Sequence, residues 1–344
     1  MGGIGNRVWV ASIGVAMGGL AGCGGEAAEP PAEPSAQFVR LEESGAAPEP
    51  TPPIEQQAAP APAVEATRPP APQATAPEVA APAPDEQPMP ARGSAGERER
   101  SALAALDAGE FASASRQLSA MLVDAIRSDS ASPEQLRSWS GALDRAQAGH
   151  RWSRRGSWPS LETTVQSGDS LIAIRARVLT ANPGLLLSTG LVARANQLAS
   201  ETSIRPGEVL RIPTDRPSAI VDISSRWVLY LLGDEVAASW EVGVGKDTTP
   251  TRPGRYTVGL KQKEPMWSPV GRDPVPYGDP QNPLGTRWLA WFEDGRNTSL
   301  GFHGTNDASG VGRAVSDGCV RMRNADVELL FEILPKDASV LVQP

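Results

Sequence analysis

The chain has 344 residues, enough for several domains, and a formal net charge of −8 at pH 7. Twelve Asp and Glu against three Arg give residues 24–97 a net charge of −9, so the rest of the chain is close to neutral. Nucleic-acid binding requires clustered Lys and Arg, so we expect no nucleic-acid partner. Two cysteines and two histidines in the whole chain also argue against a zinc enzyme, and we expect neither a metal nor a cofactor.

Residues 1–22 predict an export signal. Arg7 precedes an apolar run over 8–20 that is too short to cross a bilayer as a helix. The run ends Leu-Ala-Gly-Cys, which resembles a bacterial lipobox, in which the cysteine becomes the lipidated first residue; an ordinary signal peptide is the alternative. Lipidation of Cys23 would anchor the protein to a membrane and leave Cys319 as a free thiol without a disulfide partner.

Two segments with different composition follow the signal. Residues 23–97 are mostly Pro, Ala and Glu, and they cannot bury enough apolar surface to offset the entropy cost of ordering. We therefore expect a long disordered N-terminal tether. Over 98–150, apolar residues recur at helical spacing, and Ser132 and Gln135 form a capping box. This pattern predicts a short α-helical hairpin, with a plain spacer preferred over a faint similarity to a tetratricopeptide unit.

A basic turn follows the predicted helices. His150 is followed by Arg151, Arg154 and Arg155 between two patterned segments, where we expect a linker. We interpret these residues as a solvated turn, and contact with anionic headgroups or glycan is the alternative.

Residues 160–214 predict a small βααβ domain. Thr164-Val165-Gln166-Ser167-Gly168-Asp169 indicates a strand, a glycine turn and a helix cap, and Ile204 to Pro213 supplies a turn and a returning strand. The segment resembles a LysM module, which implies binding to N-acetylglucosamine-containing glycans such as peptidoglycan. The insertion Asn182-Pro183-Gly184 departs from the usual pattern of that family and leaves the glycan affinity open.

Residues 217–344 predict a β-rich domain with one reactive pair of residues. Alternating apolar residues over 219–224 and 227–232 indicate strands, and helical spacing returns at 324–334. His303 and Cys319 lie near the end, in a segment rich in glycine. A thiolate is the nucleophilic form of cysteine, and a nearby imidazole can accept its proton and leave an ion pair. This combination suggests acyl transfer through a thioester, whereas each residue alone is more often structural.

The spacing of this pair carries a resemblance. His-Gly-Thr-Asn at 303–306 and Ser-x-Gly-Cys-Val-Arg-Met-x-Asn at 316–324 resemble the signature of the L,D-transpeptidase catalytic domain, whose members remodel bacterial peptidoglycan. The resemblance implies a mostly-β sandwich or barrel in a multidomain protein. It also implies attack on the L,D-peptide bond of tetrapeptide stems, in an exported protein that faces the periplasm or cell wall.

The same resemblance suggests roles for individual residues. Cys319 is the proposed nucleophile, His303 the general base and acid, Gly304 the backbone carbonyl that orients His303, and Gly318 an oxyanion-hole donor. The substrate-binding candidates are a set of polar and aromatic residues around this pair: Arg321, Ser316, Thr305, Asn306 and Trp267.

Several alternatives stay open at this point. Arg321 has two interpretations, a carboxylate-binding residue or a partner of Asp326, and Asn324 is expected to cap the following helix. Asp317 stands where many relatives carry a basic residue, and it opposes ionisation of the thiol only if it points into the site. An L,D-carboxypeptidase of the same fold and a non-catalytic lipoprotein that tethers the wall are the alternative functions.

Overall fold

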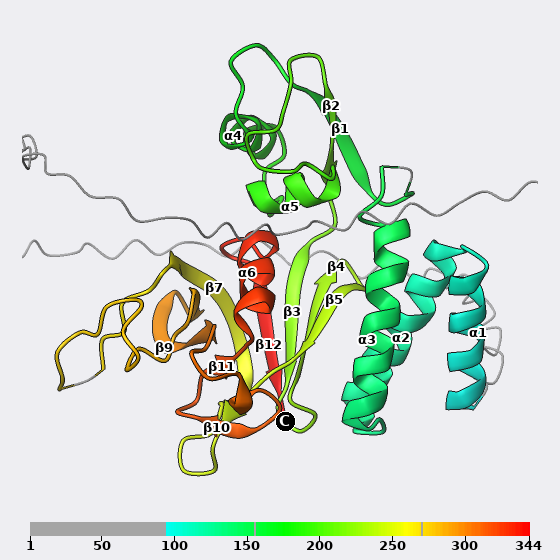
Figure 1. The fold of residues 1–344 in the computed structure, drawn as a ribbon. Coiled ribbons are helices and arrows are strands. Elements are labelled where there is room, and N and C mark those ends of the chain that lie inside the picture. Colours follow the sequence, from blue (N-terminus) through cyan, green and yellow to red (C-terminus); the bar gives the residue numbers. More distant parts are fainter. Residues whose placement is uncertain (1–93, 155, 270) are drawn as a thin grey trace, which may run out of the picture. The chain divides into compact units, whose positions relative to one another are not determined.

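A computed structural model describes residues 94–154, 156–269 and 271–344, which belong to one compact unit (Figure 1). The predicted signal, Cys23 and nearly all of the predicted tether lie outside the described residues. Within the described ranges, no helix is both long and apolar enough to span a bilayer.

Three helices form the first part of the described chain. They are α1 (Ala95–Asp107), α2 (Phe111–Ser128) and α3 (Pro133–Gly149). Capping boxes at Ser94 and Ser132 explain where α1 and α3 begin, because each serine accepts a hydrogen bond from the third helical N–H. The first helix therefore begins three residues before the expected boundary at 98.

These helices are part of the main fold and not a plain spacer. Their apolar faces share a core with strand β4 (Trp227–Leu232) and with Val236 of β5 (Glu235–Glu241). Side chains of the helices also bond the backbone of β5: Val236 N donates to Ser119 at 2.8 Å, and Gln147 donates to Val236 O at 2.7 Å. The helices thus satisfy a sheet edge whose backbone groups would otherwise lack partners.

The basic turn after α3 is buried, so the expectation of a solvated turn was wrong. Arg151 is only 3% exposed and forms ion pairs with Asp215 at 2.7 Å and Glu235 at 3.1 Å. His150 is 5% exposed, and burial lowers its pKa. Two carboxylates from the β-rich part offset the cost of removing the Arg151 charge from water. Arg155 lies outside the described residues.

The next part has the predicted βααβ order. It consists of β1 (Ser160–Thr164), α4 (Leu171–Ala181), α5 (Thr189–Ala195) and β2 (Val209–Pro213), with β1 and β2 antiparallel. The insertion noted in the sequence ends α4: Asn182 is its C-cap, and Gly184 has a φ of +91°. A glycine adopts that backbone angle without strain.

The C-terminal part is mostly β, as expected, and its strands form one large sheet. An eight-stranded sheet has the order β11-β9-β8-β7-β12-β3-β4-β5, and β6 and β10 form a separate parallel pair. The remaining bounds are β3 (Pro217–Asp222), β6 (Val244–Gly245), β7 (Gly254–Lys263), β8 (Arg287–Glu293), β9 (Arg296–His303), a 3-10 turn (Ala308–Gly310), β10 (Ala314–Ser316), β11 (Val320–Arg321), α6 (Asn324–Ile333) and β12 (Ser339–Gln343).

The two strands next to the predicted reactive pair, His303 and Cys319, lie together at one edge of this sheet. β11 runs parallel to β9, while α6, which follows β11, packs on β8 and β9 (Figure 1). Buried aromatic residues fix the inner face of these strands, with the Trp291 and Phe302 rings in edge-to-face contact at 4.9 Å. The opposite face of β9 and β11 is the one that carries polar residues.

Candidate active site

Strand pairing brings His303 and Cys319 to the same face. In the β9–β11 register, Val320 pairs with Phe302 and Arg321 pairs with His303. Because side chains alternate along a strand, Cys319 and Arg321 point to the same side as His303, while Val320 and Phe302 enter the core. His303 and Cys319, which are sixteen positions apart in the sequence, are thus diagonal neighbours on adjacent strands.

The Cys319 thiol contacts an irregular part of β9. Its Sγ donates to the Ser299 carbonyl at 3.6 Å, and Ser299 has a φ of +61°, where β9 departs from regular pairing with β8. Burial raises the pKa of the thiol to about 11, and the Asp317 charge adds to this increase. A hydrogen bond from the Gly301 backbone and the charge of Arg321 act in the opposite direction. Such bulges commonly aim a group at an active site.

His303 is held as a neutral imidazole with one defined tautomer. It is 4% exposed, and its Nδ1 lies 2.6 Å from the Gly304 carbonyl oxygen. Because a carbonyl only accepts, Nδ1 carries the proton and Nε2 is left as the basic atom. Burial lowers the pKa of His303 to about 4 despite this bond, and Arg321 lowers it further. Both shifts favour a neutral thiol and a neutral imidazole at rest over the ion pair that the sequence suggested.

Asn324 holds the peptide that orients His303. Its Oδ1 accepts from Thr305 N at 3.0 Å and from Thr286 N at 3.3 Å, and its Nδ2 donates to Thr305 O at 3.0 Å. The predicted role as a helix cap was wrong, because Arg323 occupies the N-cap and Asn324 is the first helical residue. Thr305 N and the Gly304 carbonyl belong to one planar peptide, so fixing the N–H also fixes the carbonyl that His303 uses.

Close packing around Asn324 explains two glycines. A Cβ built on Gly304 would lie 2.2 Å from Asn324 Oδ1, and one on Gly285 would lie 2.3 Å from the same atom. Side chains at these positions would displace the amide group. Gly304 thus leaves space for the Asn324 amide and also provides the carbonyl that bonds His303.

Ser316 shapes the turn before Cys319. Its Oγ donates to the Cys319 carbonyl at 2.6 Å and accepts from Gly318 N at 3.3 Å, while Gly318 has a φ of +105°. The Gly318 N–H, proposed as an oxyanion donor, is therefore engaged by a long hydrogen bond in this structure. Ser316 is buried and supports the backbone of this turn.

Three other predicted residues lie in loops beyond the pair. Thr305 is buried, and its hydroxyl donates to Asp307 O at 2.9 Å. Asn306 is exposed and donates to Pro280 O at 2.8 Å. Trp267 pairs through its backbone with Val275 in the segment between β7 and β8. Their hydrogen bonds are internal to the loops, so the structure brings none of these three side chains into polar contact with the pair.

Trp288 is a neighbour that sequence reasoning did not assign to the site. It pairs with His303 across β8 and β9, and the two ring centroids are 6.1 Å apart. Its signal in the sequence was only its place in an apolar strand. The strand register, which the sequence does not specify, makes it a wall of the site.

Arg321 has no ion pair or hydrogen bond from its side chain within the described part of the chain, and its buried Nε has no acceptor there. The alternative partner, Asp326, instead pairs with Arg323 at 3.9 Å. The backbone of Arg321 is held on both sides, because its N and O each bond Gly243 at 2.8 Å. The guanidinium thus carries a positive charge without a direct ion pair among the described residues, on the face that holds Cys319.

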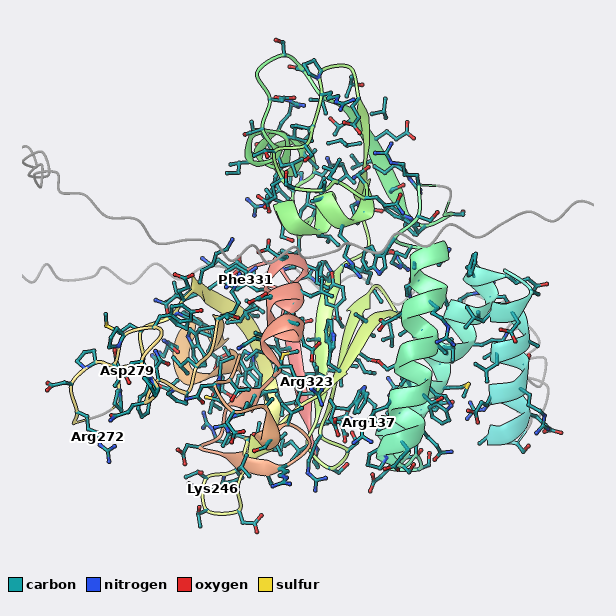
Figure 2. The ribbon with its side chains drawn as sticks, viewed as in Figure 1. Arg137, Lys246, Arg272, Asp279, Arg323 and Phe331 are labelled. Carbon is teal, nitrogen blue, oxygen red and sulfur yellow. The ribbon has the colours of Figure 1, made fainter. Side chains whose placement is uncertain are left out.

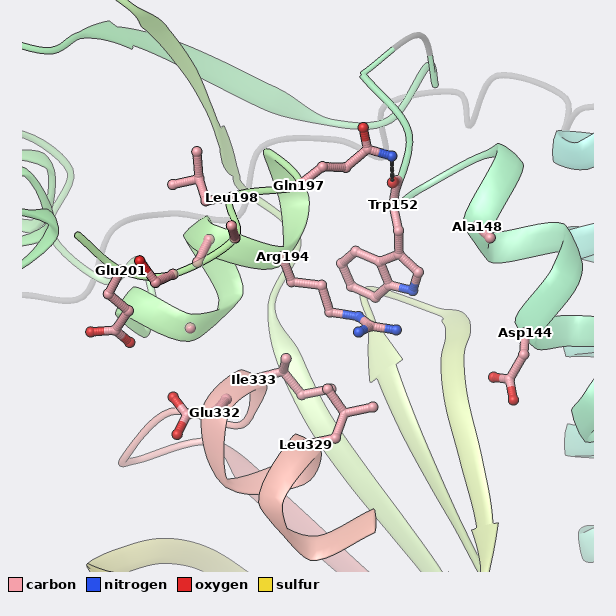
Figure 3. Close-up of a pocket in the computed structure, with 14 residues that line it drawn as sticks. Asp144, Ala148, Trp152, Arg194, Gln197, Leu198, Glu201, Leu329, Glu332 and Ile333 are labelled. Atoms are coloured by element: carbon pink, nitrogen blue, oxygen red, sulfur yellow. Dashed lines mark hydrogen bonds between the residues drawn. The ribbon is translucent and has the colours of Figure 1, made fainter. Parts of the chain in front are cut away.

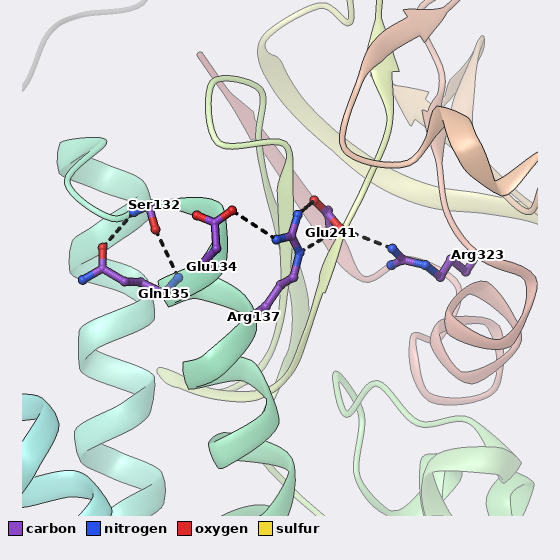
Figure 4. A network of polar contacts seen from close by, with 6 residues as sticks. All are labelled: Ser132, Glu134, Gln135, Arg137, Glu241 and Arg323. Atoms are coloured by element: carbon purple, nitrogen blue, oxygen red, sulfur yellow. Dashed lines mark hydrogen bonds and ion pairs between the residues drawn. The ribbon is translucent and has the colours of Figure 1, made fainter.

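A three-residue network fixes the chain just beyond this strand. Glu241, at the end of β5, bonds Arg137 of α3 at 2.7 Å and Arg323 at 3.3 Å (Figure 4). Glu241 is largely buried, and although burial alone raises its pKa, hydrogen bonds to the two arginines lower it overall. The network ties the helical part to the N-cap residue of α6.

Asp317 points away from the thiol. Its carboxylate pairs with Lys246 at 2.7 Å, is 80% exposed, and also accepts from Thr249 at 3.3 Å. The hydrogen bond to Lys246 lowers the pKa of Asp317. Lys246 was not predicted, since it lies far from Asp317 in the sequence, and its positive charge opposes the effect that Asp317 has on Cys319. The described residues contain no group of three His, Cys, Asp or Glu side chains that fits a metal ion.

Comparisons with known proteins agree with this architecture. The family model of the L,D-transpeptidase catalytic domain matches residues 216–342, and the LysM model matches 163–213. The putative L,D-transpeptidase YqjB of Bacillus subtilis is 33% identical over 132 residues, covering 38% of this chain and 73% of that protein. The putative L,D-transpeptidase YkuD of Bacillus licheniformis is 31% identical over 181 residues, covering 52% of this chain and 97% of that protein.

Among solved structures, the catalytic domain of the E. faecium L,D-transpeptidase aligns with 38% of this chain and 98% of that chain, at 22% identity and a TM-score of 0.30. The family assignment rests on the sequence relatives and the family models. The chain belongs to the L,D-transpeptidase family, with a LysM domain preceding its catalytic domain.

Proposed function

We propose that the protein cleaves the L,D-peptide bond of peptidoglycan tetrapeptide stems through a thioester on Cys319 and transfers the acyl group to an amine of another stem. The observation that carries this proposal is the arrangement of Cys319 and His303 on one sheet face, with Nδ1 of His303 bound to the Gly304 carbonyl at 2.6 Å. That bond leaves Nε2 as a base directed to the same face as the thiol.

The chemistry follows from the neutral resting pair. His303 Nε2 takes the thiol proton as Sγ attacks the carbonyl carbon, because the raised pKa of Cys319 and the lowered pKa of His303 disfavour proton transfer beforehand. The imidazolium then gives the proton to the departing amine of the terminal D-residue, and the thioester remains. An acceptor amine attacks this thioester, His303 takes its proton, and Cys319 leaves and is reprotonated.

Backbone N–H groups at the turn before β11 are the candidates for stabilising the oxyanion. The Cys319 N–H is the first, and the Gly318 N–H is the second once it leaves its 3.3 Å bond to Ser316. Arg321, whose charge has no counter-ion among the described residues, is proposed to bind a carboxylate of the stem.

The other parts of the chain support a place in the cell envelope. A LysM domain suits binding to the glycan of peptidoglycan. The proposed lipid anchor at Cys23, outside the described residues, would hold the exported protein at a membrane, with the catalytic domain facing the periplasm or wall. The segment before α1 would then act as a tether.

Mass spectrometry of a purified disaccharide-tetrapeptide incubated with the protein tests this function, with Cys319→Ala as the matched control. Loss of the terminal D-residue together with a crosslinked dimer, both absent in the variant, is the expected result. Tripeptide without dimer would assign a carboxypeptidase. No turnover by the wild-type chain would leave a wall-binding lipoprotein and overturn the proposal.

A further inference from the structure

A cavity of about 550 Å³ lies away from Cys319, between α3, α5 and α6 (Figure 3). Its walls include Asp144 of α3, Arg194 of α5, and Leu329 and Ile333 of α6. In Figure 3 the Arg194 guanidinium lies between the Trp152 ring and Ile333, at the centre of the group of lining residues. The volume is in the range of sites that hold small ligands.

Arg194 is a partly buried cation without an anionic partner. Within the described ranges its side chain forms no ion pair or hydrogen bond, and its buried Nε lacks an acceptor. Its one defined contact is the face of Trp152, 4.8 Å from the guanidinium carbon. Burial lowers the pKa of Arg194. Removing a guanidinium from water without a counter-ion is unfavourable, so an anion in the cavity would stabilise it.

The acidic residues of the cavity do not fill that role. Glu201 accepts from Thr189 at 2.7 Å, and Glu332 pairs with Lys263 at 3.6 Å. Asp144 interacts with Arg194 only through its field: no ion pair joins them, and burial raises the pKa of Asp144. The guanidinium donors therefore stay available to a ligand that enters the cavity.

The walls favour a peptide over a sugar. Trp152 is 6% exposed and its face is covered by Arg194, so it offers no open ring on which a sugar can stack. The lining also includes the partly exposed aliphatic side chains of Leu198 and Leu329, which lie beside the fully buried Ile333. A carboxylate next to a small aliphatic side chain matches both the cation and these walls.

We propose that this cavity binds the free carboxylate of a peptide, with Arg194 as its partner and the aliphatic wall of α6 against the adjacent side chain. This last step rests on the proposed function: the peptide would be a peptidoglycan stem, different from the stem that reacts at Cys319. The LysM domain and α6 would then share a second substrate site.

Binding of N-acetyl-Ala-Ala and of its C-terminal amide tests the proposal directly. Both ligands are titrated against the full chain carrying Cys319→Ala and Arg321→Gln, which removes the proposed carboxylate site near the nucleophile, and followed by ligand-observed NMR. The acid is expected to bind at least tenfold more tightly than the amide, because a guanidinium–carboxylate hydrogen bond is charge-assisted. Equal binding of acid and amide would overturn the proposal.

Substitutions of Arg194 and Asp144 should change the affinity for the acid in opposite directions. Arg194→Gln should weaken binding of the acid by tenfold or more, and Arg194→Lys should retain part of it. Asp144→Asn should strengthen it, since a like charge is removed. Unchanged affinity in Arg194→Gln, with unfolding temperature preserved, would refute the site. If the dipeptide binds but a stem tetrapeptide does not compete with it, the carboxylate site stands and its assignment to stems falls.

Discussion

The contact between Asn324 and the Gly304–Thr305 peptide makes a specific prediction about catalysis. Asn324→Ala removes three hydrogen bonds, two into Oδ1 and one from Nδ2. At about 0.5–1.5 kcal/mol each, their loss should lower the free energy of unfolding by about 1.5–4.5 kcal/mol. The freed peptide also releases the carbonyl that fixes His303 at 2.6 Å. A displacement of the imidazole by about 1 Å is enough to lower kcat about 100-fold.

Asn196 in the LysM domain is a matched control. It is buried and also makes three hydrogen bonds, accepting from Arg211 N at 2.8 Å and donating to Arg211 O at 2.7 Å and Val192 O at 2.8 Å. Asn196→Ala should therefore lose similar stability. Because it touches no part of the catalytic domain's His303 loop, its kcat on a soluble disaccharide-tetrapeptide should stay near that of the wild type.

Asn324→Asp separates the two halves of the contact. It keeps an oxygen for the Thr305 and Thr286 N–H groups but loses the donor to Thr305 O, so it should retain more activity than Asn324→Ala. The assay is kcat and KM on the soluble donor, with urea unfolding of each variant. If Asn324→Ala loses stability like Asn196→Ala yet keeps its kcat, the positioning argument is wrong.

Further predictions concern charge and packing. Burial raises the pKa of Cys319 to about 11, so the rate of its alkylation by iodoacetamide should still increase with pH above pH 9. A rate that is constant from about pH 7 upward would indicate a preformed ion pair. The pKa of His303 falls from 6.5 to about 4 on folding, so the unfolded chain binds its proton first as the pH drops. The free energy of unfolding, measured with urea, should therefore decrease by about 3 kcal/mol between pH 6.5 and 4. The decrease should be smaller in His303→Gln. At a fixed pH, Asp317→Asn should increase the rate of Cys319 alkylation by less than tenfold, and Lys246→Ala should decrease it. Asp317→His should leave the turnover rate unchanged or raise it. Deleting residues 94–149 should expose the apolar face of β4 and cause aggregation, measured by light scattering, whereas a soluble monomer would contradict the packing argument.

Much of this architecture was predictable because its signals are local. The βααβ order followed from caps and turns, and the strands followed from alternation of apolar residues. The reactive pair was identified because His303 and Cys319 belong to one short, glycine-rich segment. Their placement on one face was not derivable from spacing alone, since it depends on the parallel register of β9 and β11.

What the sequence did not reveal depends on partners that are far apart along the chain. Arg151 looked solvated because its carboxylates, Asp215 and Glu235, lie in another part of the chain. Asn324 had the position of a helix cap, and only the fold brings Thr305 within its reach. In each case a polar side chain had a plausible local role, and a distant backbone or charged group provided a more favourable one.

Helix α6 connects the two regions that we interpret as functional. Its ten residues span about 15 Å, since an α-helix rises 1.5 Å per residue. Asn324 at its first turn holds the peptide behind His303, while near its end the Glu332 carbonyl accepts from Ser188 of the LysM domain and Ile333 lines the Arg194 cavity. A packed helix moves as a rigid body, so a ligand that shifts the end of α6 also shifts Asn324. A cavity that only holds substrate would alter KM alone, whereas one that acts through α6 would alter kcat, because Asn324 of the same helix holds the peptide whose carbonyl orients His303, the proposed base.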